Sequence, residues 1–207
     1  MIKTSTKNFF KDSINEIKIE NERKNLLNKI ANQIAIEYSK NSLVNLNFIC
    51  THNSRRSQLG QVWSFFAANY FNLNINAFSG GTEVTAFHGN TVKTLQKAGF
   101  TFELEDFSHQ NPKYSVSFES NSKKLSGFSK KFDNPVNAEP FIAITTCNNA
   151  DVNCPFIPTA SYRFHLPFVD PKASDNTDHK DKTYLATNRQ IAAEVFYIFS
   201  EIKNLVS

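Results

Sequence analysis

Residues 43–57 have the sequence LVNLNFICTHNSRRS, an apolar segment followed directly by a polar one. Within residues 43–49, apolar and polar positions alternate and end in an apolar pair, as is typical of a buried β-strand. Apolar residues at helical spacing from Leu59 to Tyr70 predict a helix after the polar segment. A strand, a short loop and a helix in this order direct backbone N–H groups and the positive helix end toward an anion. The sequence therefore predicts an oxyanion site on residues 50–57.

Cys50 is the candidate nucleophile of this loop. A cysteine reacts as its thiolate, and a loop of amides ahead of a helix N-terminus stabilises that anion. Arg56 can curl back over the loop and hold two oxygens of a tetrahedral anion with its planar guanidinium. Ser57 could donate a hydrogen bond to the Cys50 sulfur, and Asn53 could brace the loop in a left-handed conformation. The alternative is a buried cysteine with a surface arginine nearby.

The Cys-x5-Arg-Ser pattern from Cys50 to Ser57 resembles the phosphate-binding loop of low-molecular-weight protein tyrosine phosphatases and of the arsenate reductases that share their fold. The family commonly has a small residue where this chain has His52, whose side chain is expected to point outward. The resemblance implies that the oxyanion is bound by the loop residues Thr51, His52, Asn53, Ser54, Arg55, Arg56 and Ser57.

The flanking sequence predicts a helical extension and an alternation of strands and helices. Apolar residues recur at helical spacing over residues 7–40, which predicts an amphipathic extension packed on the core. Gly80 and Gly81 are expected to form a turn, and residues 112–134 a hairpin insertion. Further strands are expected at residues 74–79, 141–146 and 163–166, and further helices at residues 90–98 and 184–205.

Strands that alternate with helices indicate a parallel sheet, whose ligands bind at the carboxyl ends of the strands. Cys50, Cys147 and Asp170 all lie at or just beyond such ends. With the resemblance, this predicts an α/β three-layer sandwich with a four-stranded parallel sheet, of the low-molecular-weight phosphatase type. We expect one domain over residues 1–207, with a helical extension over residues 1–42 and a catalytic part over residues 43–207.

Cys147 and Cys154 lie seven positions apart, after the strand expected at residues 141–146. In a helix they would be about 10 Å apart, too far for a disulfide unless the segment partly unwinds. Pro155 prevents a helix from continuing beyond Cys154. Redox exchange, two inert buried thiols and a metal site remain open. The spacing fits zinc sites poorly, and no metal is expected.

This Cys-x6-Cys-Pro pattern resembles the resolving-cysteine segment of the thioredoxin-coupled arsenate reductases. The resemblance implies a relay in which Cys50 attacks arsenate and Cys147 attacks Cys50, releasing arsenite. Cys154 then attacks Cys147 and leaves a disulfide that thioredoxin reduces. No bound cofactor is expected, because thioredoxin supplies the electrons.

The segment Phe168-Val169-Asp170-Pro171 resembles the Asp-Pro loop that carries the general acid in this fold. The resemblance implies that Asp170 protonates the leaving oxygen of the substrate. Residues 172–175 follow, where the phosphatases often have aromatic residues. This departure favours a small inorganic oxyanion over phosphotyrosine.

Three functions follow from these patterns. The first is an arsenate reductase that uses Cys50, Cys147 and Cys154. The second is a low-molecular-weight phosphatase that hydrolyses phosphomonoesters with Cys50, Arg56 and Asp170 alone. The third is a redox sensor that binds an oxyanion or arsenite. Cys147 and Cys154 discriminate between the first two, because a phosphatase needs neither.

The composition is that of a globular protein of 207 residues with a net charge of +4, which suits an anionic substrate. The densest basic stretch comprises Lys123, Lys124, Lys130 and Lys131, is expected to be solvated surface, and suggests no nucleic-acid partner. No apolar run approaches the roughly 20 residues that span a bilayer, and the N-terminal residues lack a signal-peptide core. A cytoplasmic protein without a membrane partner is therefore expected.

Overall fold

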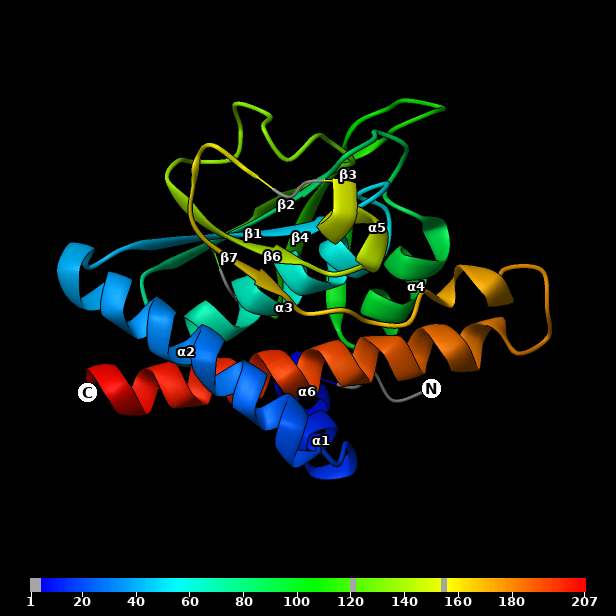
Figure 1. Cartoon of the computed structure of the whole chain (residues 1–207). Helices are drawn as coiled ribbons and strands as arrows, with labels where there is room; N and C mark the ends of the chain where they lie inside the picture. Colours follow the sequence, from blue (N-terminus) through cyan, green and yellow to red (C-terminus); the bar gives the residue numbers. More distant parts are fainter. Residues whose placement is uncertain (1–4, 120–121, 154–155) are drawn as a thin grey trace.

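The computed structural model describes residues 5–119, 122–153 and 156–207 (Figure 1). Cys154 and Pro155 thus lie outside the described residues. The elements are, in chain order, α1 (Thr6–Glu16), α2 (Asn21–Asn41), β1 (Val44–Cys50), α3 (Arg56–Tyr70), β2 (Ile75–Gly81), α4 (Gly89–Lys97), β3 (Phe100–Asp106), β4 (Lys113–Phe118), β5 (Leu125–Gly127), β6 (Phe141–Thr145), α5 (Asn148–Asn153), β7 (Ala160–His165), η1 (Pro171–Ser174) and α6 (Lys180–Val206).

The predicted four-stranded parallel sheet is confirmed, with the strand order β2-β1-β6-β7. In the register of β1 and β6, Ile49 lies opposite Thr145, so both strands end at the same edge. Cys50 is the last residue of β1, and Cys147 follows β6 by two residues. The sheet therefore brings the first two cysteines of the predicted relay to one edge.

The expected turn at Gly80 and Gly81 is wrong, because both residues belong to β2. The segment around Lys130 pairs with the end of this strand: the Gly81 N–H donates to the Lys130 carbonyl (2.8 Å). A Cβ atom on Gly80 would lie 2.2 Å from the Phe132 Cα. Glycine is required here by the close approach of a neighbouring backbone rather than by a turn.

A second, antiparallel sheet has the strand order β3-β4-β5. β4 and β5 form the hairpin predicted within residues 112–134, and its status as an insertion stays a prediction. The first strand, β3, was not predicted, although Phe100, Phe102 and Leu104 alternate with polar residues at the period of a strand. Most of β3 beyond Phe100 is exposed, so its apolar signal is weak.

The residues of β6 alternate between two apolar clusters on opposite faces of the parallel sheet. Ile142 and Ile144 belong to the main core, together with residues of α3 and α6. Phe141 and Ala143 belong to a smaller cluster with Cys50, Cys147 and Ala150 of α5. In Figure 1, α3 lies between the sheet and α6. The fold thus has three layers: a layer of helices, the parallel sheet, and a thin layer that contains α5.

The prediction of one continuous helix over residues 7–40 is wrong, because the segment forms two helices, α1 and α2. α1 ends at Glu16, and Ile17 has an extended backbone conformation (φ −93°, ψ 112°). The break lets both α1 and α2 pack on α6. Phe9 and Phe10 stack on Trp63 of α3, each with ring centroids 5.4 Å apart. The segment before β1 therefore shares its core with the rest of the chain.

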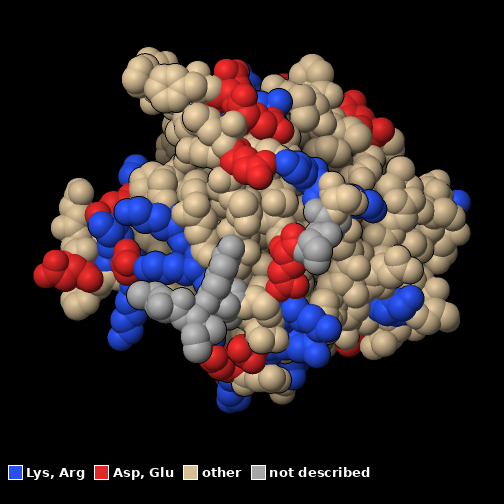
Figure 2. All heavy atoms as spheres, turned by 180° about the vertical axis from the view of Figure 1, so that it is seen from behind, with Lys and Arg blue, Asp and Glu red and all other residues tan. Residues whose placement is uncertain are grey.

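The surface offers no long run of one charge on the face that Figure 2 shows, where Lys and Arg side chains are interspersed with Asp and Glu. Among the described residues, no helix combines the length and the apolar character that crossing a bilayer requires.

Candidate active site

The Cys50 side chain lies buried at the end of β1, with 4% of its surface exposed. Its Sγ is 3.0 Å from the Oγ of Ser57. The side-chain amide of Asn53 donates to the same Oγ (2.9 Å), so the hydroxyl proton of Ser57 is available to the sulfur. A hydrogen bond in that direction stabilises a thiolate, as the sequence predicted for Ser57.

Asn53 braces the loop in the predicted left-handed conformation, with φ 45°. Its side chain is fully buried, and its Oδ1 accepts hydrogen bonds from the Lys130 N–H (2.9 Å) and the Gln58 side chain (3.2 Å). The amide thus joins the loop to α3 and to the segment beside β2. Three bonds from one side chain fix the curvature of the loop.

Lys130 is buried with only 2% of its surface exposed, so the expected solvated basic stretch is wrong at this residue. The Lys130 backbone is hydrogen-bonded to both Asn53 of the loop and Gly81 of β2. This position directs its side chain into the protein. The Nζ lies over the Phe128 ring, 4.8 Å from its centroid. Burial lowers the pKa of Lys130 to about 8.

The His52 side chain points away from Cys50, toward Glu83, as expected. Its Nε2 lies 3.4 Å from the Glu83 carboxylate, and 38% of the imidazole is exposed. The His52 carbonyl accepts hydrogen bonds from the hydroxyls of Thr85 (2.9 Å) and Ser129 (3.0 Å). A larger residue is therefore accommodated at this position because the loop is held through its backbone.

Gly81 lies against the backbone of the loop. A Cβ atom there would meet the Thr51 carbonyl oxygen at 2.7 Å and the Asn53 nitrogen at 2.8 Å. Neither atom can move without changing the path of the loop. A side chain at Gly81 would therefore displace the amides that are expected to bind the oxyanion.

We expect Gly81→Ala to weaken binding of inorganic phosphate to the loop by about tenfold to a hundredfold, because misplacement of binding groups by about 1 Å costs that much. Titration calorimetry would measure the change. Gly89→Ala is the matched control, since a Cβ atom at Gly89 meets nothing within 4 Å. Equal affinities of Gly81→Ala and wild type would show that the loop amides do not bind the anion.

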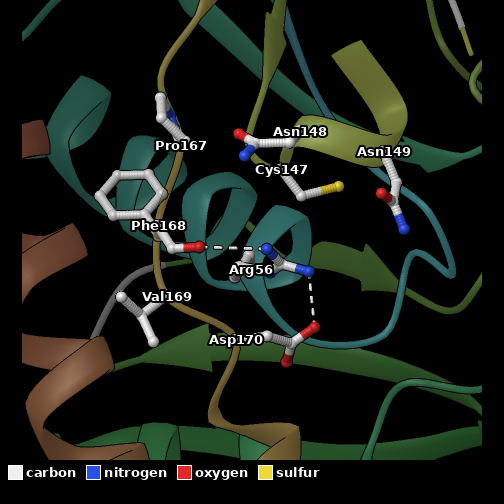
Figure 3. A pocket seen from close by; sticks show the side chains of 8 residues that line it. All are labelled: Arg56, Cys147, Asn148, Asn149, Pro167, Phe168, Val169 and Asp170. Carbon is white, nitrogen blue, oxygen red and sulfur yellow. Dashed lines mark hydrogen bonds and ion pairs between the residues drawn. The ribbon is translucent and has the colours of Figure 1, made fainter. Parts of the chain in front are cut away.

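Arg56 and Asp170 meet at the mouth of the site (Figure 3). The guanidinium donates to the Phe168 carbonyl (3.0 Å) and to the Asp170 carboxylate (2.5 Å). Its side chain is 12% exposed and that of Asp170 is 33% exposed. The structure thus places the predicted oxyanion ligand and the predicted acid in direct contact. An oxyanion in the loop would compete with Asp170 for Arg56.

Cys147 lies in the same pocket as Arg56 and Asp170. The pocket has a volume of about 610 Å³ and is lined by Arg56, Cys147, Asn148, Asn149, Pro167, Phe168, Val169 and Asp170 (Figure 3). Cys147 is 4% exposed and packs in one apolar cluster with Cys50. The Thr51 hydroxyl is 3.5 Å from its Sγ. Cys50, Arg56, Cys147 and Asp170 therefore share one edge of the sheet.

The helix that follows Cys147 is short and contacts the sheet through two side chains, Asp151 and Asn148, whose Oδ1 is 3.1 Å from the His165 Nε2 of β7. α5 spans Asn148–Asn153, and its Asp151 accepts hydrogen bonds from Thr145 (2.8 Å) and Arg163 (2.5 Å). The third cysteine of the predicted relay, Cys154, follows this helix and lies outside the described residues. Its predicted role stays a prediction.

Some known proteins resemble this chain in sequence. No protein-family model matches the chain. The chain is 28% identical to an arsenate reductase of Brevibacillus brevis over 128 residues, which cover 62% of this chain and 77% of the relative. It is 27% identical to an arsenate reductase of Bacillus licheniformis over 154 residues, which cover 74% of this chain and 93% of the relative.

This chain is similar in sequence to arsenate reductases.

This chain has the fold of the low-molecular-weight phosphatases. A low-molecular-weight protein tyrosine phosphatase from T. tengcongensis superimposes with a TM-score of 0.51 and 13% identity. The match covers 76% of this chain and 98% of the phosphatase. This likeness confirms the predicted fold class.

One cluster of this chain was not predicted from the sequence. The Arg55 side chain, expected to belong to the oxyanion-binding loop, extends to Tyr184 of α6 (2.6 Å) and to Asp175 (2.5 Å). His88, the N-cap of α4, lies with its Nδ1 3.2 Å from the Tyr184 hydroxyl. Burial, and secondarily the charge of Arg55, lower the pKa of His88. These partners are far apart in the chain, and no local pattern marks them.

Proposed function

We propose that this protein reduces arsenate to arsenite with its own cysteine thiols as the immediate electron source. The observation that carries the proposal is the position of Cys147, which lines the same pocket as Arg56 and Asp170 and packs in one cluster with Cys50. A phosphatase has no use for a second thiol there. The homology to arsenate reductases supports the same conclusion.

In the first step, the Cys50 thiolate attacks the arsenic atom of arsenate. A sulfur–arsenic bond forms, and one arsenic–oxygen bond breaks. The leaving oxygen takes a proton from Asp170 and departs as water, while arsenic stays in the +5 state. Arg56 and the loop amides bind the remaining oxygens, where negative charge is concentrated.

In the second step, the Cys147 thiolate attacks the Cys50 sulfur. A disulfide bond forms and the sulfur–arsenic bond breaks, with its electron pair remaining on arsenic. Arsenic is reduced to the +3 state, and two cysteines are oxidised. The product takes up protons from solvent and leaves as arsenous acid. The two thiols are buried in one cluster, which supports a direct attack of one on the other.

In the third step, Cys154 attacks Cys147 and restores the Cys50 thiolate. The Cα atoms of a disulfide lie within about 7 Å, whereas seven helical positions span about 10 Å. Since α5 lies between the two cysteines in the chain, we expect it to unwind for this step. A thioredoxin-type dithiol then reduces the Cys147–Cys154 disulfide without a bound cofactor. We expect this chemistry in the cytosol, where free thiols persist.

The test of this proposal uses Cys154→Ser. With arsenate, this variant is expected to complete one turnover and to accumulate the Cys50–Cys147 disulfide, which peptide mass spectrometry detects. Sulfate in place of arsenate is the control, because it is not reduced by this route. If arsenate yields no arsenite and no such disulfide, the reductase proposal is wrong.

Phosphomonoester hydrolysis is the second candidate function, favoured by the contact of Arg56 with Asp170 beside Cys50 and by the shared phosphatase fold. A phosphoenzyme on Cys50 would need only these three side chains. Wild-type protein that cleaves para-nitrophenyl phosphate rapidly but makes no arsenite with thioredoxin and its reductase would support this alternative.

A further inference from the structure

Two consecutive arginines at the start of α3 each hold a different carboxylate of the segment that follows β7. Arg56 donates to Asp170 and Arg55 donates to Asp175, both at 2.5 Å. The two carboxylates flank η1 (Pro171–Ser174): Asp170 is its N-cap and accepts from the Lys172 N–H (3.0 Å), and Asp175 is its C-cap. The acid segment, residues 170–175, is therefore fixed to the oxyanion loop at both ends.

The Arg56–Asp170 pair lies in the pocket where an oxyanion would bind, whereas the Arg55–Asp175 pair does not line that pocket. Arg56 lines the pocket and is the side chain that an oxyanion in the loop would recruit. Asp170 can turn toward the substrate only when it is released from Arg56, because the guanidinium occupies one of its two carboxylate oxygens. Substrate binding is therefore expected to remove the attachment at Asp170. The attachment at Asp175 remains.

We propose that the Arg55–Asp175 pair is a positioning device, which keeps the acid segment docked on the oxyanion loop while Arg56 is engaged with the substrate. Arg55 and Asp175 act through Asp170 and do not touch the reacting atoms. The inference deepens the proposed function and rests on it for its catalytic consequence, whereas the docking of the segment can be measured without turnover.

The surroundings of the pair make it a durable attachment. The Tyr184 hydroxyl accepts from the Arg55 Nε (2.6 Å) and donates to the Asp175 Oδ1 (2.6 Å), so it closes a three-membered network. Asn90 of α4 adds a longer hydrogen bond to the same carboxylate oxygen (3.3 Å). The pair is mostly buried, with side-chain exposures of 10% for Arg55 and 20% for Asp175. Charge-assisted bonds of this kind are stronger than those between neutral groups.

The ionisation of the network favours the same role. Burial alone would raise the pKa of Asp175, but the Tyr184 hydrogen bond and the Arg55 charge outweigh it and hold the pKa below its usual range. Burial and the hydrogen bond to Asp175 raise the pKa of Tyr184 to about 12. Asp175 therefore stays charged and Tyr184 stays a donor throughout the pH range in which the protein would work.

The first measurement is hydrogen–deuterium exchange of residues 167–175 at saturating inorganic phosphate. Asp175→Asn is expected to exchange about tenfold faster than wild type, because a hydrogen bond to a charged group is lost. Asp181→Asn is the matched control: Asp181 also pairs with a cation, Lys97 (2.7 Å), but is 62% exposed and lies on α6. Its exchange in this segment is expected to equal that of wild type.

The second measurement is the single-turnover rate of the arsenate-dependent Cys50–Cys147 disulfide. Asp175→Asn is expected to lower the maximal rate by about tenfold and to change the half-saturating arsenate concentration by less than about twofold. Merely structural damage to the loop would weaken arsenate binding as well. Arg55→Lys keeps a charge opposite Asp175 and is expected to retain a rate between those of Asp175→Asn and wild type.

If Asp175→Asn fails to fold, Tyr184→Phe takes its place, because it removes the bridging hydroxyl and keeps the ring. Unchanged exchange at saturating phosphate in the folded variant would overturn the inference, and so would a loss of arsenate affinity without a loss of maximal rate. A wild-type protein that makes no arsenite would refute the proposed function alone, since the exchange measurement still decides whether the pair docks the segment.

Discussion

Cys147→Ser is expected to abolish multiple-turnover reduction of arsenate by the thioredoxin system, with a loss of more than about a hundredfold in kcat. A serine hydroxyl cannot displace arsenite from the Cys50 adduct, so arsenic would stay in the +5 state. Cleavage of para-nitrophenyl phosphate, which needs only Cys50, Arg56 and Asp170, is expected to change by less than about twofold. Arsenite formation and nitrophenol release, followed on the same preparation, measure both activities.

The paired measurement separates the relay from simple damage to the site. Loss of both activities would show that Cys147 is needed for the shape of the pocket that it lines. Full arsenate turnover by Cys147→Ser would contradict the relay, because Cys147 would then not be required. The expected outcome, loss of reduction with hydrolysis kept, assigns a redox role to Cys147.

Arg56→Lys is expected to lower kcat/KM for arsenate by about a hundredfold to a thousandfold, because a lysine cannot donate two parallel hydrogen bonds to a tetrahedral anion. The charge is kept, so the loss would come from geometry. Steady-state kinetics with arsenate give the change. The inhibition constant of inorganic phosphate is expected to rise in parallel, since the same donors bind it.

Arg189→Lys is the matched control for Arg56→Lys. Arg189 lies on α6 and pairs with Glu16 at the end of α1, on the opposite side of α3 from the sheet. This variant is expected to match wild type within about twofold in kcat/KM. A value for Arg56→Lys as close to wild type would show that Arg56 contributes only its charge, and that the pair of donors is not used.

The loop and its two flanking elements could be predicted from the sequence because their information is local. Cys50, Asn53 and Ser57 lie within eight consecutive residues, and their side chains contact one another in the structure. Likewise, the apolar pattern of β1 and the helical spacing of α3 are properties of one segment each. The position of Cys147 followed from the rule that parallel strands end at one edge.

The Arg55 network could not be predicted because it depends on distant residues. Arg55 lies 120 positions from Asp175 and 129 positions from Tyr184. The Cys-x5-Arg spacing assigned Arg56 to the oxyanion, but it predicted no partner for Arg55. Gly80 and Gly81 were misinterpreted for a related reason. A pair of glycines predicts a turn when only the chain itself is considered, but here it admits two neighbouring backbones.

The sandwich of Phe9 and Phe10 against Trp63 has a practical consequence. Trp63 is the only tryptophan of the chain. It lies on α3, is fully buried, and is covered by Phe9 and Phe10 of α1. The fluorescence of Trp63 therefore reports whether α1 is packed against α3. Trimming those helices to obtain a minimal enzyme would uncover an aromatic surface and favour aggregation.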